Sequence, residues 1–205
     1  MFLHYSPFWL KAFYSRYIWH IPTDDKKLFL TFDDGPIPEV TEFVLNTLKN
    51  FNAKATFFCI GDNVRKHPDI FQMLLDQGHS VGNHTFNHLK GWKTPDDVYL
   101  KNFNQCQELT GTSLFRPPYG RIRKSQVRDI RSAYPDTNII MWDVLSGDFD
   151  LQLRPEKCLK NVLKHTKNGS IVVFHDSLKA AERMQYALPR MLEHFSRLGY
   201  RFEPL

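Results

Sequence analysis

The sequence predicts an α/β fold of the barrel type, in which strands and helices alternate and the chemistry lies at one end of the strands. Short apolar runs such as 28–32 and 171–175 alternate with segments whose apolar residues recur at helical spacing. Polar residues able to bind metals or transfer protons follow directly after several of these runs. In α/β folds the carboxyl ends of the strands are where active sites form.

The expected elements follow one another along a single domain. Strands are expected at 28–32, 55–60, 79–82, 138–141, 171–175 and 199–202. Helices are expected at 40–48, 68–77, 157–167 and 187–197, with Gly78 as the C-cap of the second. The 205 residues, 42% of them hydrophobic, suffice for one core but are few for a complete eightfold barrel.

Residues 1–27 precede the first expected strand and form an aromatic segment. Ser6-Pro7 predicts the start of a helix whose apolar stripe is Leu10, Phe13, Tyr14, Tyr17 and Ile18. We expect this helix to pack on the domain, with a dimer contact or a membrane surface as alternatives. Polar residues interrupt the apolar start and no run reaches transmembrane length, so we expect a cytoplasmic location.

Charge and cysteine content exclude some classes of protein. The net charge of +5 is small and dispersed, so no nucleic-acid partner is expected. The one basic cluster, at 121–124, suits either an acidic sugar or a solvated loop. Three cysteines do not make a disulfide framework, and Cys59, within an apolar run, is expected to be a reduced core thiol.

Two motifs about fifty residues apart supply the residues of a metal site. The first, at 31–36, holds Asp33 and Asp34, and the second, at 82–88, holds His84 and His88. One carboxylate and two imidazoles suit a divalent metal, zinc first and cobalt or nickel next, with a second carboxylate as base. Alone, the first motif is typical of a turn and the second of a surface histidine pair on one helix face. Their combination favours the metal site.

Three further segments add residues suited to catalysis. Arg116 follows the apolar pair 114–115 and opens an Arg-Pro-Pro-Tyr-Gly turn. The apolar run 171–175 ends in His175, and the segment 142–149, which follows the expected strand 138–141, contains Asp148. An ordinary ion pair remains an alternative for Arg116, and a hydrogen-bonded strand-end residue for His175. Five chemically competent strand ends in one chain nevertheless favour an active site.

These motifs, in this order, resemble those of the polysaccharide deacetylases, the NodB-homology domain of carbohydrate esterase family 4. The resemblance covers about Leu28 to the C-terminus and implies a catalytic domain at 28–205. It implies a distorted (β/α) barrel with about seven strands, which the number of strand–helix repeats supports.

The resemblance also implies a role for each site residue. The metal ligands would be Asp34, His84 and His88. Asp33 would be the general base, restrained by Arg116, and His175 the general acid. The backbone N–H of Tyr119 would help to bind the oxyanion.

The chain departs from the family pattern in its fourth and fifth motifs. Leu145 stands where the family has an aspartate, Phe149 replaces a tryptophan, and Val173 replaces a leucine. Asp148, the remaining acid of the fourth motif, should lie within hydrogen-bond reach of Arg116 or His175. Trp92, four residues past His88, is expected either to form a wall of a sugar subsite or to pack in the core.

Together these features predict a metal-dependent hydrolase that removes N-acetyl groups from a sugar or glycan. Three alternatives remain on the same fold. They are a sugar O-acetyl esterase, a small-amide hydrolase and a catalytically silent carbohydrate-binding protein. The sequence does not indicate an oligomeric state.

Overall fold

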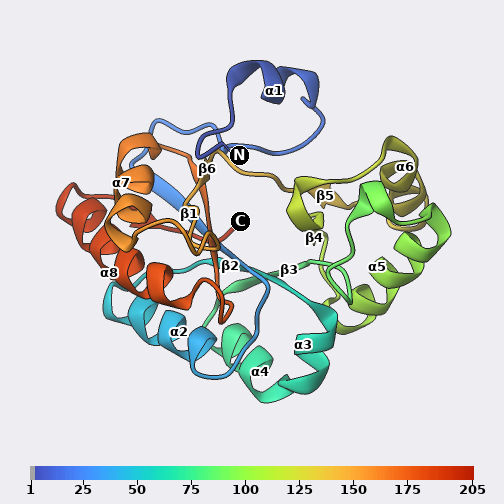
Figure 1. Cartoon of the computed structure of the whole chain (residues 1–205), viewed down its shortest axis with the longest axis horizontal. Helices are drawn as coiled ribbons and strands as arrows, with labels where there is room; N and C mark the ends of the chain where they lie inside the picture. The colour runs from blue at the N-terminus through green and yellow to red at the C-terminus, as the bar shows by residue number, and fades with distance from the viewer. Residues whose placement is uncertain (1–2) are drawn as a thin grey trace.

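The computed structural model describes residues 3–205 as a curled, parallel sheet surrounded by helices (Figure 1). The strands follow the order β5-β4-β3-β2-β1-β7-β6, and β8 pairs with the start of β1. This seven-strand path confirms the predicted distorted barrel. The strands are β1 (Lys27–Asp33), β2 (Thr56–Cys59), β3 (Ser80–Asn83), β4 (Leu114–Phe115), β5 (Asn138–Ile139), β6 (Val144–Leu145), β7 (Ile171–His175) and β8 (Arg201–Phe202).

The helices that follow α1 cover the outer face of the curled sheet (Figure 1). They are α2 (Val40–Asn50), α3 (Gly61–Lys66), α4 (Pro68–Asp76), α5 (Asp96–Thr110), α6 (Lys124–Ala133), α7 (Pro155–His165) and α8 (Ala181–Arg197). Alternate residues of β1 serve two cores, because successive side chains of a strand point to opposite faces. Leu30 and Phe32 join the main core with α2 and α8, whereas Phe29 packs with Phe58 and Ile171 in a separate cluster.

Three helices were not expected from the sequence. In α5 only Tyr99, Asn102, Phe103 and Cys106 are buried, so most of this 15-residue helix is polar and its periodic signal is weak. Helix α3 buries only two residues and helix α6 only three, so few apolar residues mark these helices in the sequence. Helix α8 begins at residue 181 rather than 187, and its internal Pro189 obscures the pattern.

The N-terminal helix is shorter than predicted. Helix α1 (Phe8–Phe13) has six residues and ends before Tyr14, so the predicted stripe is only partly helical. Leu10, Tyr14 and Tyr17 pack against the core cluster of α5 and α6. The prediction that Phe13 belongs to the packed stripe was wrong, because its side chain is 74% exposed.

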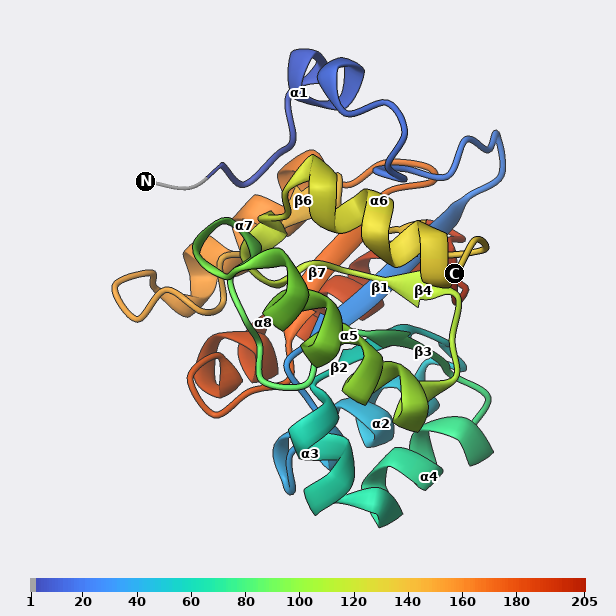
Figure 2. The same cartoon turned by 90° about the vertical axis from the view of Figure 1, so that its right-hand side faces the viewer.

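The chain on either side of α1 pairs with the two edges of the open sheet, and Figure 2 shows α1 above α6 and β6. On the β5 side, Ile18 donates to the Ile139 carbonyl and accepts from the Met141 N–H, at 2.9 and 2.7 Å. On the β6 side, the Ser6 N–H donates to the Asp143 carbonyl at 2.9 Å. The segment therefore spans the gap between the two edge strands, which would otherwise leave backbone groups unpaired.

The buried Asp143 carboxylate anchors this segment. It forms an ion pair with Lys11 and lies 3.2 Å from the His20 ring nitrogen and 2.8 Å from the Ser170 hydroxyl that donates to it. One carboxylate thus joins α1, the chain after it and the loop before β7.

Cys59, Cys106 and Cys158 are buried free thiols, and Cys59 lies in β2 as expected. Within residues 3–205, the structure has no helix long and apolar enough to cross a membrane.

Candidate active site

The turn after β1 places two adjacent carboxylates in different surroundings. Asp33 is the last, buried residue of the strand, while Asp34 has a positive φ of 86° and turns the chain away. The Asn63 side chain donates to the Asp34 carbonyl at 2.7 Å and holds this turn. The two carboxylates therefore face separate partners although they are neighbours in sequence.

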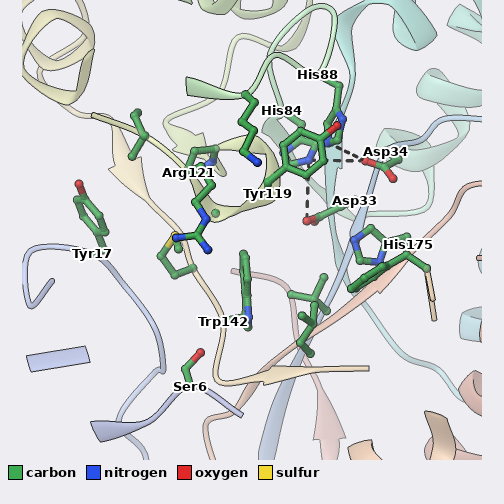
Figure 3. A pocket seen from close by; sticks show the side chains of 18 of the residues that line it. Ser6, Tyr17, Asp33, Asp34, His84, His88, Tyr119, Arg121, Trp142 and His175 are labelled. Atoms are coloured by element: carbon green, nitrogen blue, oxygen red, sulfur yellow. Dashed lines mark ion pairs between the residues drawn. The ribbon is translucent and has the colours of Figure 1, made fainter. Parts of the chain in front are cut away.

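Asp34, His84 and His88 converge on one point, with candidate ligand atoms all within 4.8 Å of one another (Figure 3). The His88 Nε2 atom lies 3.3 Å from Asp34 Oδ1, and the His84 Nε2 atom 3.7 Å. The two histidines lie in the loop after β3, where His88 has a positive φ of 57°, and not on a helix. The sequence-predicted trio is therefore assembled by loop geometry.

Three features of the trio fit a divalent metal. Asp34 Oδ1 is buried without a hydrogen-bond partner among the described residues, which is costly unless a cation occupies the site. His84 Nδ1 lies 2.7 Å from the Arg116 carbonyl, which leaves Nε2 for the ligand position. Burial lowers the pKa of His84, and it lowers that of His88 to about 4, so both rings are neutral and able to coordinate.

Asp33 is held as a carboxylate by a buried arginine. Arg116 is fully buried, and its guanidinium donates to Asp33 Oδ1 at 2.6 Å and to the Thr31 hydroxyl at 2.7 Å. Burial would raise the pKa of Asp33. The Arg116 charge, with smaller contributions from His84 and His175, nevertheless holds this pKa below its usual value. The backbone carbonyls of Ile140 and Met141 accept from the Arg116 Nε and Nη2 atoms, respectively.

His175, at the end of β7, is held by the fourth-motif carboxylate. Its Nδ1 lies 2.7 Å from Asp148 Oδ1, and its backbone N–H donates to Asp148 Oδ2 at 2.7 Å. Burial would lower the pKa of His175, but the charge and hydrogen bond of Asp148 outweigh it and raise the pKa to about 9. The prediction that Asp148 reaches Arg116 or His175 is thus confirmed for His175.

The substituted motif residues line the catalytic end of the cleft. Leu145, Phe149 and Val173 all contribute to its wall, and the Phe149 ring meets the His175 ring edge-on with centroids 5.1 Å apart. Tyr119 has a positive φ of 60°, and its ring lies 4.6 Å from that of His88. The substitutions leave an apolar wall beside the acid.

The cleft holds about 780 Å³, within the ~300–1,000 Å³ of small-molecule pockets. Trp92 lines it and is 48% exposed, so the core alternative for this residue was wrong. Its indole N–H donates to the Ile122 carbonyl at 3.1 Å, which fixes the ring at the rim.

Sequence reasoning did not single out Asp176, which supports the turn that carries the paired aspartates. Its carboxylate accepts from the Gly35 N–H at 3.0 Å and from the Thr41 hydroxyl at 2.6 Å. A Cβ at position 35 would lie 1.9 Å from this carboxylate, so the turn requires glycine. Burial raises the pKa of Asp176 to about 8. The sequence feature that could have indicated Asp176 is its position directly after His175, at the end of an apolar run.

Comparisons with known proteins agree with this geometry. The family model described as polysaccharide deacetylase matches residues 20–135, more than half of the chain. A peptidoglycan-N-acetylglucosamine deacetylase of Bacillus cereus is 32% identical over 90% of this chain and 88% of its own length. A peptidoglycan-N-acetylglucosamine deacetylase of Listeria monocytogenes is 35% identical over 87% of this chain, which spans only 38% of that relative.

Solved structures share the fold over nearly the whole chain. The crystal structure of the Bc1960 peptidoglycan N-acetylglucosamine deacetylase has a TM-score of 0.87 and 29% identity, covering 98% of this chain and 95% of that one. A pseudoenzyme of the same carbohydrate esterase family from Bacillus anthracis has a TM-score of 0.79 and 25% identity, covering 92% and 66%. On the family match, the identity to full-length relatives and the shared fold, the chain belongs to the polysaccharide deacetylase family.

Proposed function

We propose that this polysaccharide deacetylase removes N-acetyl groups from amino sugars of a cell-wall-type glycan, using a divalent metal held by Asp34, His84 and His88. The observation that carries the proposal is the placement of two proton-transfer groups beside the ligand trio. Asp33 and His175 each have a buried partner of opposite charge, and both line the same cleft as the trio.

The residues divide the reaction into two proton transfers. Asp33 accepts a proton from the water whose oxygen attacks the acetyl carbonyl carbon. Protonated His175 donates a proton to the amide nitrogen as the carbon–nitrogen bond breaks, giving acetate and a free amine. The backbone N–H of Tyr119 is the proposed donor to the carbonyl oxygen. A bound zinc ion would polarise that oxygen and lower the pKa of water, with cobalt or nickel as substitutes.

Each group has the protonation state that its task requires. Arg116 holds the pKa of Asp33 below its usual value, so a base is available at neutral pH. Asp148 raises the pKa of His175 to about 9, so an acid is available there too. At neutral pH the proton is therefore on His175, the residue proposed to protonate the leaving amine.

The Bacillus anthracis pseudoenzyme shows that this fold alone does not imply catalysis. A silent carbohydrate-binding protein is therefore the alternative to test. The chain retains every residue that the proposal needs: Asp33, Asp34, His84, His88, Arg116, Asp148 and His175.

Metal removal and reconstitution provide the test. The chelator-treated protein should release no acetate from N-acetylglucosamine oligomers, and stoichiometric zinc should restore release. Sugar O-acetyl esters and small acetamides, assayed in parallel, distinguish deacetylase from esterase and small-amide hydrolase. A reconstituted protein that binds zinc and hydrolyses none of them would overturn the proposal in favour of the silent protein.

A cell-wall glycan lies outside the cytoplasm. The proposed substrate thus disagrees with the cytoplasmic location expected from the sequence, which stays a prediction. Fractionation of the source cells would test that location. The proposed catalytic domain is 28–205, with 1–27 as a segment packed on it.

A further inference from the structure

The catalytic cleft continues well beyond the groups that the deacetylation needs. From Asp33 and His175 it extends past Trp142 to Tyr17 on the N-terminal segment (Figure 3). An acetyl group occupies only the metal end of this space. The far part therefore has room for a portion of the substrate that does not react.

Aromatic side chains form the walls of this far part. Tyr14 and Tyr17 are stacked with centroids 5.6 Å apart, and both line the cleft together with Trp142. Sugar rings present apolar C–H faces, and rigid aromatic side chains bind such faces with little loss of rotamer entropy. The walls thus suit a second sugar ring next to the one that is deacetylated.

Arg121 brings a positive charge into the same space. Figure 3 shows its guanidinium extending into the pocket on the side of Tyr17 and Trp142. The guanidinium lies 4.2 Å over the Trp92 ring, which is itself fixed by its hydrogen bond to Ile122. The arginine is therefore held in position although it is exposed.

This charge has no counter-ion among the residues that the structure describes. Within residues 3–205 neither Arg121 nor Lys90, also in the cleft lining, forms an ion pair, whereas the nearby Arg123 is paired with Asp96 at 2.9 Å. Among the described residues that line the cleft, only Asp33 and Asp34 are acidic. The first is paired with Arg116, and the second belongs to the ligand trio. The far part of the cleft is therefore electropositive.

We propose, resting on the function proposed above, that this far part binds the neighbouring sugar of the glycan and that Arg121 pairs with a carboxylate carried by that sugar. The planar guanidinium matches a carboxylate in two parallel hydrogen bonds. Tyr17 and Trp142 supply the surfaces for the ring. The preferred substrate class is thus an acidic glycan rather than a neutral one.

The test compares two glycans with the same sugars, one with charged carboxylates and the other with neutral amides in their place. One is a tetrasaccharide of alternating N-acetylglucosamine and carboxylate-bearing N-acetylmuramic acid, and the other has each carboxylate converted to a methyl amide. The quantity measured is the ratio of kcat/KM for the acid over the amide, for the zinc-loaded enzyme. We expect a ratio of roughly five to ten, falling toward one as salt is added.

Variants assign the preference to one side chain. Arg121→Gln should bring the ratio close to one, mainly through KM, and Arg121→Glu should invert it. The matched control is Arg190→Gln, because Arg190 also lies over an aromatic ring, 3.9 Å from Tyr186, but outside the cleft lining. This control should keep the wild-type ratio.

The outcomes separate the two proposals. A wild-type ratio of one, with both glycans deacetylated, would overturn the acidic subsite and leave the proposed function intact. A ratio that survives in Arg121→Gln would overturn the role of Arg121. Deacetylation of neither glycan would overturn the proposed function and the subsite together.

Discussion

The base side and the acid side of the cleft use the same arrangement with opposite charges. On one side a buried carboxylate, Asp33, is paired with a buried arginine at 2.6 Å. On the other side an imidazole, His175, is paired with a buried carboxylate at 2.7 Å. Each pairing opposes the effect of burial on a pKa, so that buried Asp33 stays ionised and buried His175 stays protonated at neutral pH. The buried partner therefore decides which group starts as base and which as acid.

The supports differ in how firmly they are tied to the fold. Arg116 is held by two backbone carbonyls, the Thr31 hydroxyl and the Phe58 ring, 4.1 Å below its guanidinium. The Asp148 carboxylate accepts from His175 through both of its oxygens, and the Asp148 backbone carbonyl accepts from the Arg183 guanidinium at 2.7 Å. The base side is thus part of the core, and we expect its disruption to affect stability as well as activity.

The largest effect is expected from removing the two proton-transfer groups themselves. Asp33→Asn should lower turnover by a factor on the order of 10²–10⁴ because it removes the general base. Zinc content, measured by elemental analysis, should stay near wild type because Asp33 is outside the ligand trio. His175→Ala should cause a similar loss. Wild-type turnover in either variant would show that its role is assigned wrongly.

The next effect separates the supports by stability. Arg116→Met leaves Asp33 as an unpaired buried carboxylate, which costs ~3–5 kcal/mol. For a domain of this size the Tm should fall by roughly 6–20 °C in calorimetry at neutral pH. The double variant Arg116→Met/Asp33→Asn should recover part of the loss because no charge remains unpaired. An unchanged Tm in the single variant would contradict the core role of this pair.

A smaller effect is expected from the acid-side support, and it depends on pH. Asp148→Asn removes the charge that raises the pKa of His175 to about 9, so that pKa falls toward its ordinary value of 6.5. Because the acid works only when protonated, the alkaline limb of the pH–rate profile moves to lower pH. The loss should be roughly thirtyfold at pH 8 and slight at pH 6. A parallel loss at both pH values would argue against this role.

The smallest effect concerns the aromatic ring beside the His175–Asp148 pair. Phe149→Leu removes the ring that meets His175 edge-on, while both hydrogen bonds between His175 and the Asp148 carboxylate remain. Turnover should fall roughly two- to tenfold. Phe149→Trp, which restores the usual family residue, serves as the control and should retain activity. A loss as large as that of His175→Ala would mean that the ring, and not Asp148, positions the acid.

The sequence allowed prediction where a site residue directly follows an apolar run. Asp33, Asp34 and His175 were predicted for this reason, and the barrel class followed from the repeats. The sequence left two possible partners for Asp148, Arg116 and His175. It could not decide between them because the contact with His175 joins residues 27 positions apart. Helix α5 was missed because few of its residues are buried.

Pairing over long sequence distances was the least predictable part. The amphipathic pattern of the N-terminal segment indicated one continuous helix, but Ile18 forms backbone hydrogen bonds with the β5 edge instead. Hydrogen bonds at a strand edge override local helical preference, and no local pattern reports which edge is open. The same holds for Asp143, whose partners lie 27 to 132 positions away.

The position of the N-terminal segment across the sheet opening has a practical consequence for where the protein can be cut. A chain trimmed to begin at Leu28 would match the family motifs but would lack residues that pair with two strand edges. It would also leave the Asp143 carboxylate buried without Lys11 and His20. Exposed edges recruit other chains, so the trimmed protein should aggregate rather than remain a smaller enzyme.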